Sequence, residues 1–269
     1  MRKAFFLILS MLCAVTVDAQ SSSCDEPDFI VPSRPTVSNP AEFQRPGVLQ
    51  LELGYNSNFH APGFSIEQDL PLALRFAVTR RLLLEFDGDS PNSQTVDRVK
   101  TTGVGDTQLG IQVVLQHQQE TRPAISFAYY IKLPTASSTK GLGTGRVDHN
   151  FIALVSKNIG KLTVDFNAIY LLAGRTSEGG HSSSGQGALA ASRGITKRFG
   201  IQGEISGASR NDAQPGTMFL LGALTFQVNH RLVLDAGLRA GLTHEAPRLG
   251  FFTGMTVGIA DLYHRHHRG

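Results

Sequence analysis

The stretch "RLVLDAGLRAGL" (231–242) alternates between apolar and non-apolar residues along its whole length. Its even-numbered residues from Leu232 to Leu242 are all leucine or alanine, whereas its odd-numbered residues include Asp235 and Arg239. A helix would instead need apolar residues at spacings of three and four. Because successive side chains of a strand point to opposite faces, the stretch predicts a β-strand with one greasy face and one hydrophilic face.

The same alternation recurs from Val48 onward, for example in "KLTVDFNAIY" (161–170). We count about twelve such segments of roughly ten residues, the length that a tilted strand needs to cross a bilayer. The expected strands are 48–56, 69–78, 82–88, 105–118, 124–134, 147–157, 161–173, 186–195, 200–209, 217–228, 231–243 and 250–260.

The connections between these segments alternate between short and long. Tight turns at one end of a barrel and longer loops at the other are typical of outer-membrane barrels, in which the tight turns face the periplasm. In lipid an open sheet edge would leave backbone groups unpaired, so the sheet must close. We therefore predict an all-β fold: a transmembrane antiparallel up-and-down β-barrel of about 12 strands, with an extended N-terminal periplasmic leader. The expected long loops are 57–68, 89–104, 135–146, 174–185, 210–216 and 244–249.

A soluble barrel of the lipocalin kind is the alternative, because it shows the same alternation turned inside out. Strand number, loop asymmetry and small polar residues on the non-apolar face favour the membrane barrel. The charged fraction of 17% also lies below the roughly 25% that is usual in soluble domains.

The chain divides into four parts on composition. Residues 1–19 combine Arg2 and Lys3 with a short apolar run, which predicts a cleaved signal peptide. Residues 20–47 are rich in proline and have no periodicity, so we expect an extended periplasmic segment. The barrel is expected over 48–262, followed by a basic, His-rich tail at 263–269. The expected location is the outer membrane of a Gram-negative bacterium.

Charged residues on the non-apolar faces are the candidates for the lining of the lumen. A Lys or Arg facing lipid at mid-depth would cost about 2–4 kcal/mol, so these charges are expected to face inward. Their mixed signs indicate either a salt-bridge network across the lumen or a zwitterionic constriction. The candidates are Glu52, Arg75, Glu85, Lys132, Asp165, Glu204, Asp235 and Arg239.

Several other motifs are weaker candidates for chemistry. "GLGTG" (141–145) follows a strand but precedes no helix, so it does not predict a phosphate site. A Ser-x-x-Lys motif at Ser137–Lys140 has no partner base or oxyanion hole in sight. The histidines of the tail have no fixed carboxylate or Cys beside them. We therefore expect no catalytic residues, no enzymatic activity, no metal site and no cofactor.

The segments "GVGDTQLGIQVVL" (103–115), "AYYIKLPTAS" (128–137) and "GLGTGRVDHNF" (141–151), with the leader "RPTVSNPAEFQRPGVLQLELGY" (34–55), carry a resemblance. They resemble the outer-membrane transporter family of the meta-pathway of phenol degradation. The resemblance covers most of the chain after the signal peptide. It implies an outer-membrane barrel that passes hydrophobic or aromatic compounds, and it implies no catalytic residues.

The function expected from the sequence is therefore an outer-membrane channel or transporter for small molecules. A plugged structural or surface-binding barrel, and a soluble ligand-binding barrel, are the alternatives. The expected partners are outer-membrane lipid and a small-molecule solute. Nucleic acid is not expected, because the net charge of +3 is small and scattered. The oligomeric state stays open.

Overall fold

The computed structural model describes residues 28–61, 64–96, 99–175, 179–211 and 215–263. The expected signal peptide 1–19 and residues 264–269 of the tail lie outside the described residues. Within those ranges, no helix has the length and apolar character that a membrane-spanning helix requires. The elements are β1 (Val48–Ala61), β2 (Phe64–Ala77), β3 (Leu82–Val96), β4 (Val99–Gly103), β5 (Thr107–Gln116), β6 (Ala124–Leu133), the 3₁₀ turn η1 (Ser138–Lys140), β7 (Asp148–Ile159), β8 (Leu162–Gly174), β9 (His181–Gly194), β10 (Phe199–Ala208), β11 (Thr217–Asn229), β12 (Leu232–Gly241) and β13 (Leu249–Asp261).

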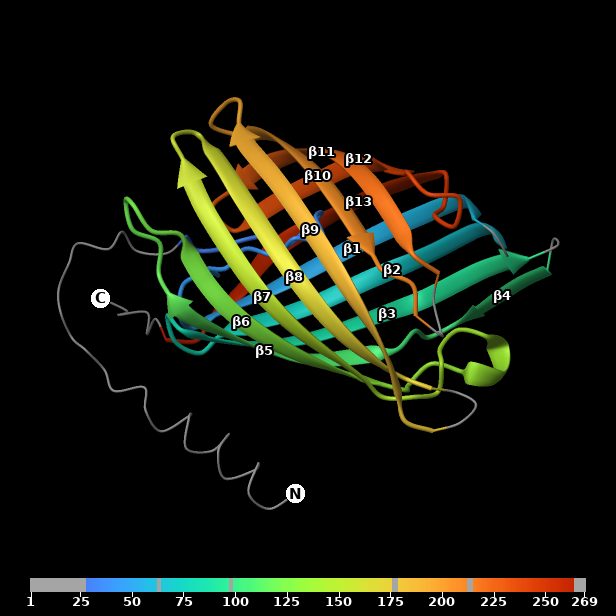
Figure 1. Cartoon of the computed structure of the whole chain (residues 1–269). Coiled ribbons are helices and arrows are strands. Elements are labelled where there is room, and N and C mark those ends of the chain that lie inside the picture. The colour runs from blue at the N-terminus through green and yellow to red at the C-terminus, as the bar shows by residue number, and fades with distance from the viewer. Residues whose placement is uncertain (1–27, 62–63, 97–98, 176–178, 212–214, 264–269) are drawn as a thin grey trace, which may run out of the picture.

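The strands form one closed antiparallel barrel (Figure 1). Strand β1 pairs with β13 from Val48↔Asp261 onward and with β2 from Leu49↔Phe76 onward, so the first and last strands seal the sheet. Strands β4 and β5 both pair with β3, and they are therefore two parts of one strand interrupted at 104–106. The prediction of a 12-stranded antiparallel barrel is confirmed.

Apolar side chains point outward and hydrophilic side chains point inward. On β12, Leu234 and Leu238 are 39% and 55% exposed, whereas Asp235 between them is 5% exposed. The same contrast holds on β8, where Phe166 is exposed and Asn167 is buried. A transmembrane barrel has this orientation. The soluble barrel, which would bury its apolar face, is wrong.

Two of the expected long loops are largely strand. Residues 57–68 belong mostly to β1 and β2, and residues 89–104 mostly to β3 and β4. Pairs such as Asn56↔Asp69 continue the ladder, and Asn56 Nδ2 donates to Asp69 Oδ2 at 2.7 Å. Polar residues at 56–58, 67–69 and 89–95 interrupt the apolar alternation, so the sequence pattern made these strands too short at the loop end.

We call the two ends of the barrel the turn end and the loop end. The turn end carries the short connections, such as 195–198, together with the start of β1 and the end of β13. The loop end carries β4 and the 3₁₀ turn η1, and it lies on the right in Figure 1.

Candidate functional site: a chain segment inside the lumen

Residues 28–46, which we call the N-terminal segment, lie inside the barrel. The backbone of Val31 exchanges two hydrogen bonds of 2.9 Å with the side-chain amide of Gln50 on β1. Two residues on, Ser33 donates to Glu52 from its backbone N at 3.0 Å and from its hydroxyl at 2.8 Å. The segment therefore rises along the inner face of β1 from the turn end.

Glycines on the wall make room for this rise. Gly54 and Gly254 face each other across β1 and β13, and a Cβ on either would collide with the guanidinium of Arg34. A Cβ on Gly258 would collide with Phe29. The inner face of β1 and β13 is thus a groove that a larger residue would fill.

The segment then crosses to the opposite wall. Arg34 donates to Asp235 on β12 at 3.3 and 3.4 Å. Ser38, which is fully buried, donates from its backbone N to Glu204 Oε2 at 2.7 Å and from its hydroxyl to Asp165 O at 2.9 Å. These contacts join the segment to β8, β10 and β12, so it bridges the lumen.

The return path follows β5, β6 and β7. Ser156 Oγ accepts from the backbone N of Ala41 at 2.8 Å, and Ser126 Oγ donates to the carbonyl of Ala41. Gln112 donates to that carbonyl as well, at 3.1 Å. Phe43 packs in a buried cluster with inward side chains of the wall. Wall side chains on several sides of the barrel therefore satisfy many polar groups of the segment, as buried backbone groups require. Gln44 Oε1 is an exception, with no hydrogen-bond partner among the described residues.

A buried ion cluster supports the segment at the turn end. Arg75 is fully buried and lies 3.4 Å from Glu52 and 3.2 Å from Glu85. The same guanidinium donates to the carbonyl of Val31 at 2.9 Å, and Tyr130 donates to Glu85 at 3.1 Å. A buried charge is tolerated when it is paired and hydrogen-bonded, and Arg75 meets this condition through its Nε and Nη1 atoms. Its Nη2 atom has no hydrogen-bond partner among the described residues.

A second cluster, which we call the loop clasp, lies at the loop end. It consists of Asp106, Lys132, Thr144 and Asp148. The ammonium of Lys132 lies 2.9 Å from Asp106, 2.8 Å from Asp148 and 3.0 Å from the hydroxyl of Thr144. Asp106 also accepts from the backbone N of Ala136 at 3.0 Å. The clasp thereby fixes the loop 134–147, which includes the Gly-rich stretch that resembled a phosphate loop.

All eight residues predicted to line the lumen are inward on their strands, but they do not act as one set. Glu52, Glu204 and Asp235 contact the N-terminal segment directly, whereas Lys132 belongs to the loop clasp. Arg239 on β12 donates at 2.8 Å to Asn58 Oδ1 on β1, and the two residues flank Gly250 of β13. That these residues line a solute pathway stays a prediction.

Sequence reasoning missed the contributions of Arg34, Ser33 and Ser38, because the N-terminal segment was expected outside the barrel wall. It also missed Asp106 and Asp148, although both lie in the segments that carried the family resemblance. Among the described residues, no three His, Cys, Asp or Glu side chains meet in a group that could hold a metal ion.

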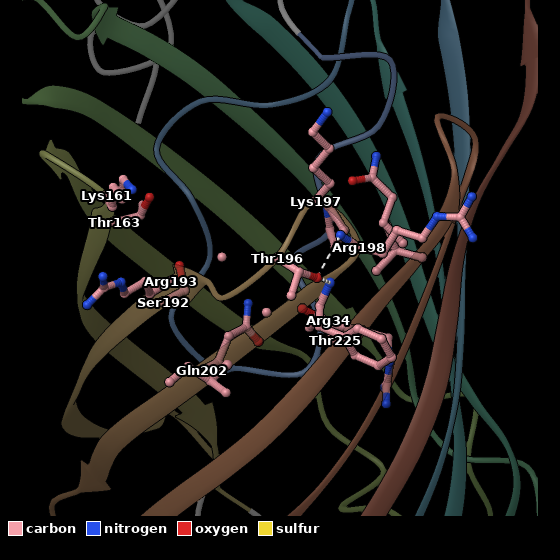
Figure 2. A pocket seen from close by; sticks show the side chains of 17 residues that line it. Arg34, Lys161, Thr163, Ser192, Arg193, Thr196, Lys197, Arg198, Gln202 and Thr225 are labelled. Atoms are coloured by element: carbon pink, nitrogen blue, oxygen red, sulfur yellow. Dashed lines mark hydrogen bonds between the residues drawn. The ribbon is translucent and has the colours of Figure 1, made fainter.

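Two cavities flank the N-terminal segment, and Arg34 lines both. The loop-side cavity, of about 270 Å³, is lined by the carboxylates Glu52, Glu85, Asp87 and Asp106. The turn-end cavity, of about 290 Å³, lies between the segment and the wall formed by β8 to β12. Figure 2 shows the turn-end cavity, with the segment as the blue tube that curves across the barrel interior.

Comparison with known proteins agrees with this architecture. The family model described as "Putative MetA-pathway of phenol degradation" matches residues 32–258, a range that includes most of the N-terminal segment. No curated protein sequence matches the chain significantly.

Two solved structures share the fold. The COG4313 outer membrane channel from Pseudomonas putida F1 superposes with a TM-score of 0.62 at 16% identity, covering 85% of this chain and 99% of that one. The NanC porin superposes with a TM-score of 0.54 at 8% identity, covering 79% and 99%. Identities this low support the fold alone.

Proposed function

The chain belongs to the family described as "Putative MetA-pathway of phenol degradation", and from that premise we propose that it is an outer-membrane channel for small molecules. We infer that hydrophobic or aromatic compounds are the solute class, as the family description suggests. The protein acts in the outer membrane of a Gram-negative bacterium and without an enzymatic step.

One observation carries the proposal: a closed barrel, apolar outside and hydrophilic inside, has a chain segment across its lumen. Eight-stranded barrels are filled by side chains, whereas barrels of 16–18 strands leave an open aqueous channel. Twelve strands fall between these limits. The N-terminal segment narrows the space further, which favours small solutes and weak currents.

The segment also favours a second candidate function, a plugged barrel that carries no solute. Its hydrogen bonds reach β1, β5, β6, β7, β8, β10 and β12, so it is held on several sides. Swelling of proteoliposomes that contain the mature protein separates the two candidates. Uptake of phenol or a small neutral sugar, above that of liposomes with heat-denatured protein, supports the channel. No uptake of either solute supports the plugged barrel.

The substitution Gly54→Ala tests whether the segment sets the size of the passage. The three atoms nearest to the new Cβ all belong to the guanidinium of Arg34, so we expect that flexible side chain to move away from Asp235 while the wall keeps its backbone. We expect faster uptake of small sugars and larger single-channel currents. Gly222→Ala is the matched control, because a Cβ there has no atom within 4 Å. Equal behaviour of both variants would reject the segment as the constriction.

A further inference from the structure

The turn-end cavity concentrates positive charge. Three basic residues, Lys161, Lys197 and Arg198, line it together with Arg34 of the N-terminal segment. Arg193 also borders the cavity, but it pairs with Leu162 and Ile201, whose side chains face outward, so its guanidinium points away from the lumen. Figure 2 shows Lys161 and Arg193 on one side, Lys197 and Arg198 nearer the centre, and Arg34 beside Thr225. The basic side chains thus come from two neighbouring stretches of wall and from the segment.

This charge is not neutralised locally. No Asp or Glu lines the turn-end cavity, and Arg34 is the one cation of these four that has an ion pair among the described residues, with Asp235. Four carboxylates line the loop-side cavity instead, of which Glu52 and Glu85 pair with Arg75 and Asp106 pairs with Lys132. The N-terminal segment therefore lies between the loop-side cavity, which is lined by carboxylates, and the turn-end cavity, which is lined by basic residues.

The wall of the turn-end cavity also offers hydrogen-bonding groups. The hydroxyl of Thr196 accepts from the backbone N of Arg198 at 3.2 Å and from that of Phe199 at 3.0 Å, which fixes the turn that carries Lys197. Thr163, Ser192 and Thr225 supply further hydroxyls. Gln202 lines the same cavity, and its Oε1 has no hydrogen-bond partner in the described part of the chain. An amide can present its N–H₂ group instead of its oxygen after a simple rotation.

We propose that the turn-end cavity binds a small oxyanion, a carboxylate or a phosphate. Ammonium and guanidinium groups together with neutral hydroxyl and amide donors are the groups that recognise such anions in proteins. The cavity opens at the turn end, so the anion reaches it from that side without passing the N-terminal segment. The inference goes beyond the proposed channel and does not depend on conduction, because binding is measurable on the protein in detergent.

Isothermal titration calorimetry with sodium phosphate and with sodium benzoate tests the proposal, using the full mature chain in a neutral detergent at low salt. We expect saturable binding of at least one anion, weakening as sodium chloride rises, because the Debye length falls from about 10 Å at 0.1 M to about 3 Å at 1 M. Binding of phosphate alone or of benzoate alone identifies which oxyanion fits. No saturable binding of either anion overturns the proposal.

The double variant Lys197→Ala/Arg198→Ala should lose about threefold to tenfold in affinity, as expected for two partly hydrated charge contacts. The matched control is Arg80→Ala/Arg122→Ala, which removes the same charge from turn-end residues outside the cavity. An equal loss in the control would mean diffuse attraction and would overturn the site. Lys161→Gln, on the other side of the cavity, gives an independent test should the double variant fold poorly.

Discussion

The two halves of the barrel hold a chain segment in different ways. In the turn-end half, the buried cluster around Arg75 supports the N-terminal segment, and the Arg75 side chain is fully shielded from solvent. In the loop-end half, the loop clasp holds the loop 134–147, and the Lys132 side chain retains 14% exposure. Arg75 is therefore fully enclosed, whereas the loop clasp is largely buried but reaches solvent at the loop-end mouth.

This difference has an energetic consequence. Electrostatic interactions are far stronger where water is excluded, and so is the penalty for leaving one partner alone. The turn-end half should therefore respond to substitution mainly with lost stability, because its charges cannot be rehydrated. The loop-end half should respond mainly with local loosening, since water replaces the missing partner.

The largest expected effect comes from Arg75→Ala. Glu52 and Glu85 would remain buried without their cation, and the carbonyl of Val31 would lose its donor. We expect the free energy of unfolding to fall by about 3–5 kcal/mol. Urea unfolding in detergent micelles measures this loss. Arg80→Ala, in the exposed turn before β3, is the control and should behave as wild type. A loss no larger than in the control would contradict the dry-cluster account.

The next effect is that of Lys132→Met, which removes the cation of the loop clasp while keeping most of its length. The unfolding free energy should fall by about 1–2 kcal/mol, between the values for exposed and buried ion pairs. Trypsin should also cut faster at Lys140, which lies in the loop that the clasp holds. Lys100→Met on β4 serves as control. Unchanged cleavage at Lys140 would show that the clasp does not restrain the loop.

A smaller effect is expected for Arg239→Ala. Its guanidinium donates to Asn58 and lies 4.7 Å from the ring of Phe219, on the loop-end side of the contact between Arg34 and Asp235. Removing this cation, which lies near Glu67, Asp69 and Glu204, should shift the ion preference toward cations. The reversal potential in a salt gradient measures that shift. Arg210→Ala, in an exposed loop, controls for net charge, and identical potentials in the two variants would remove Arg239 from the predicted lining.

The smallest effect is expected for Glu42→Gln, where the N-terminal segment meets the turn-end mouth. Glu42 lies 2.7 Å from His117, but both side chains are more than a third exposed. Solvent screening limits such a contact to less than about 1 kcal/mol. Thermal unfolding should therefore hardly change. A loss comparable to that of Arg75→Ala would mean that the mouth is as dry as the interior.

The barrel itself was predictable because its signal is local. In 231–242 the alternation predicted both the strand and its outward face, and Leu238 and Asp235 lie as expected. The alternation of short and long connections also predicted that the two ends of the barrel differ. Each of these inferences needs only residues that are neighbours in the chain, or a repeat of the same pattern.

The candidate site was predictable only in part because its partners are far apart in the chain. Ser38 and Glu204 are separated by 166 positions, and the segment around Ser38 has no periodicity that would orient it. A strand pattern says which face Glu204 occupies but not what fills the space in front of it. Gly54 and Gly254 were each a partial signal, since a glycine inside a strand can mark the close approach of another chain segment.

Both ends of the N-terminal segment meet at the same mouth, where the backbone N of Arg45 donates to the carbonyl of Asp28 at 3.0 Å. Residues 28–46 therefore form a loop that enters and leaves the lumen at the turn end, and they do not pass through the barrel from one end to the other. Withdrawal of such a loop would break none of the backbone hydrogen bonds between neighbouring strands. By this geometry, membrane insertion of the barrel and filling of its lumen by the N-terminal segment are separable events.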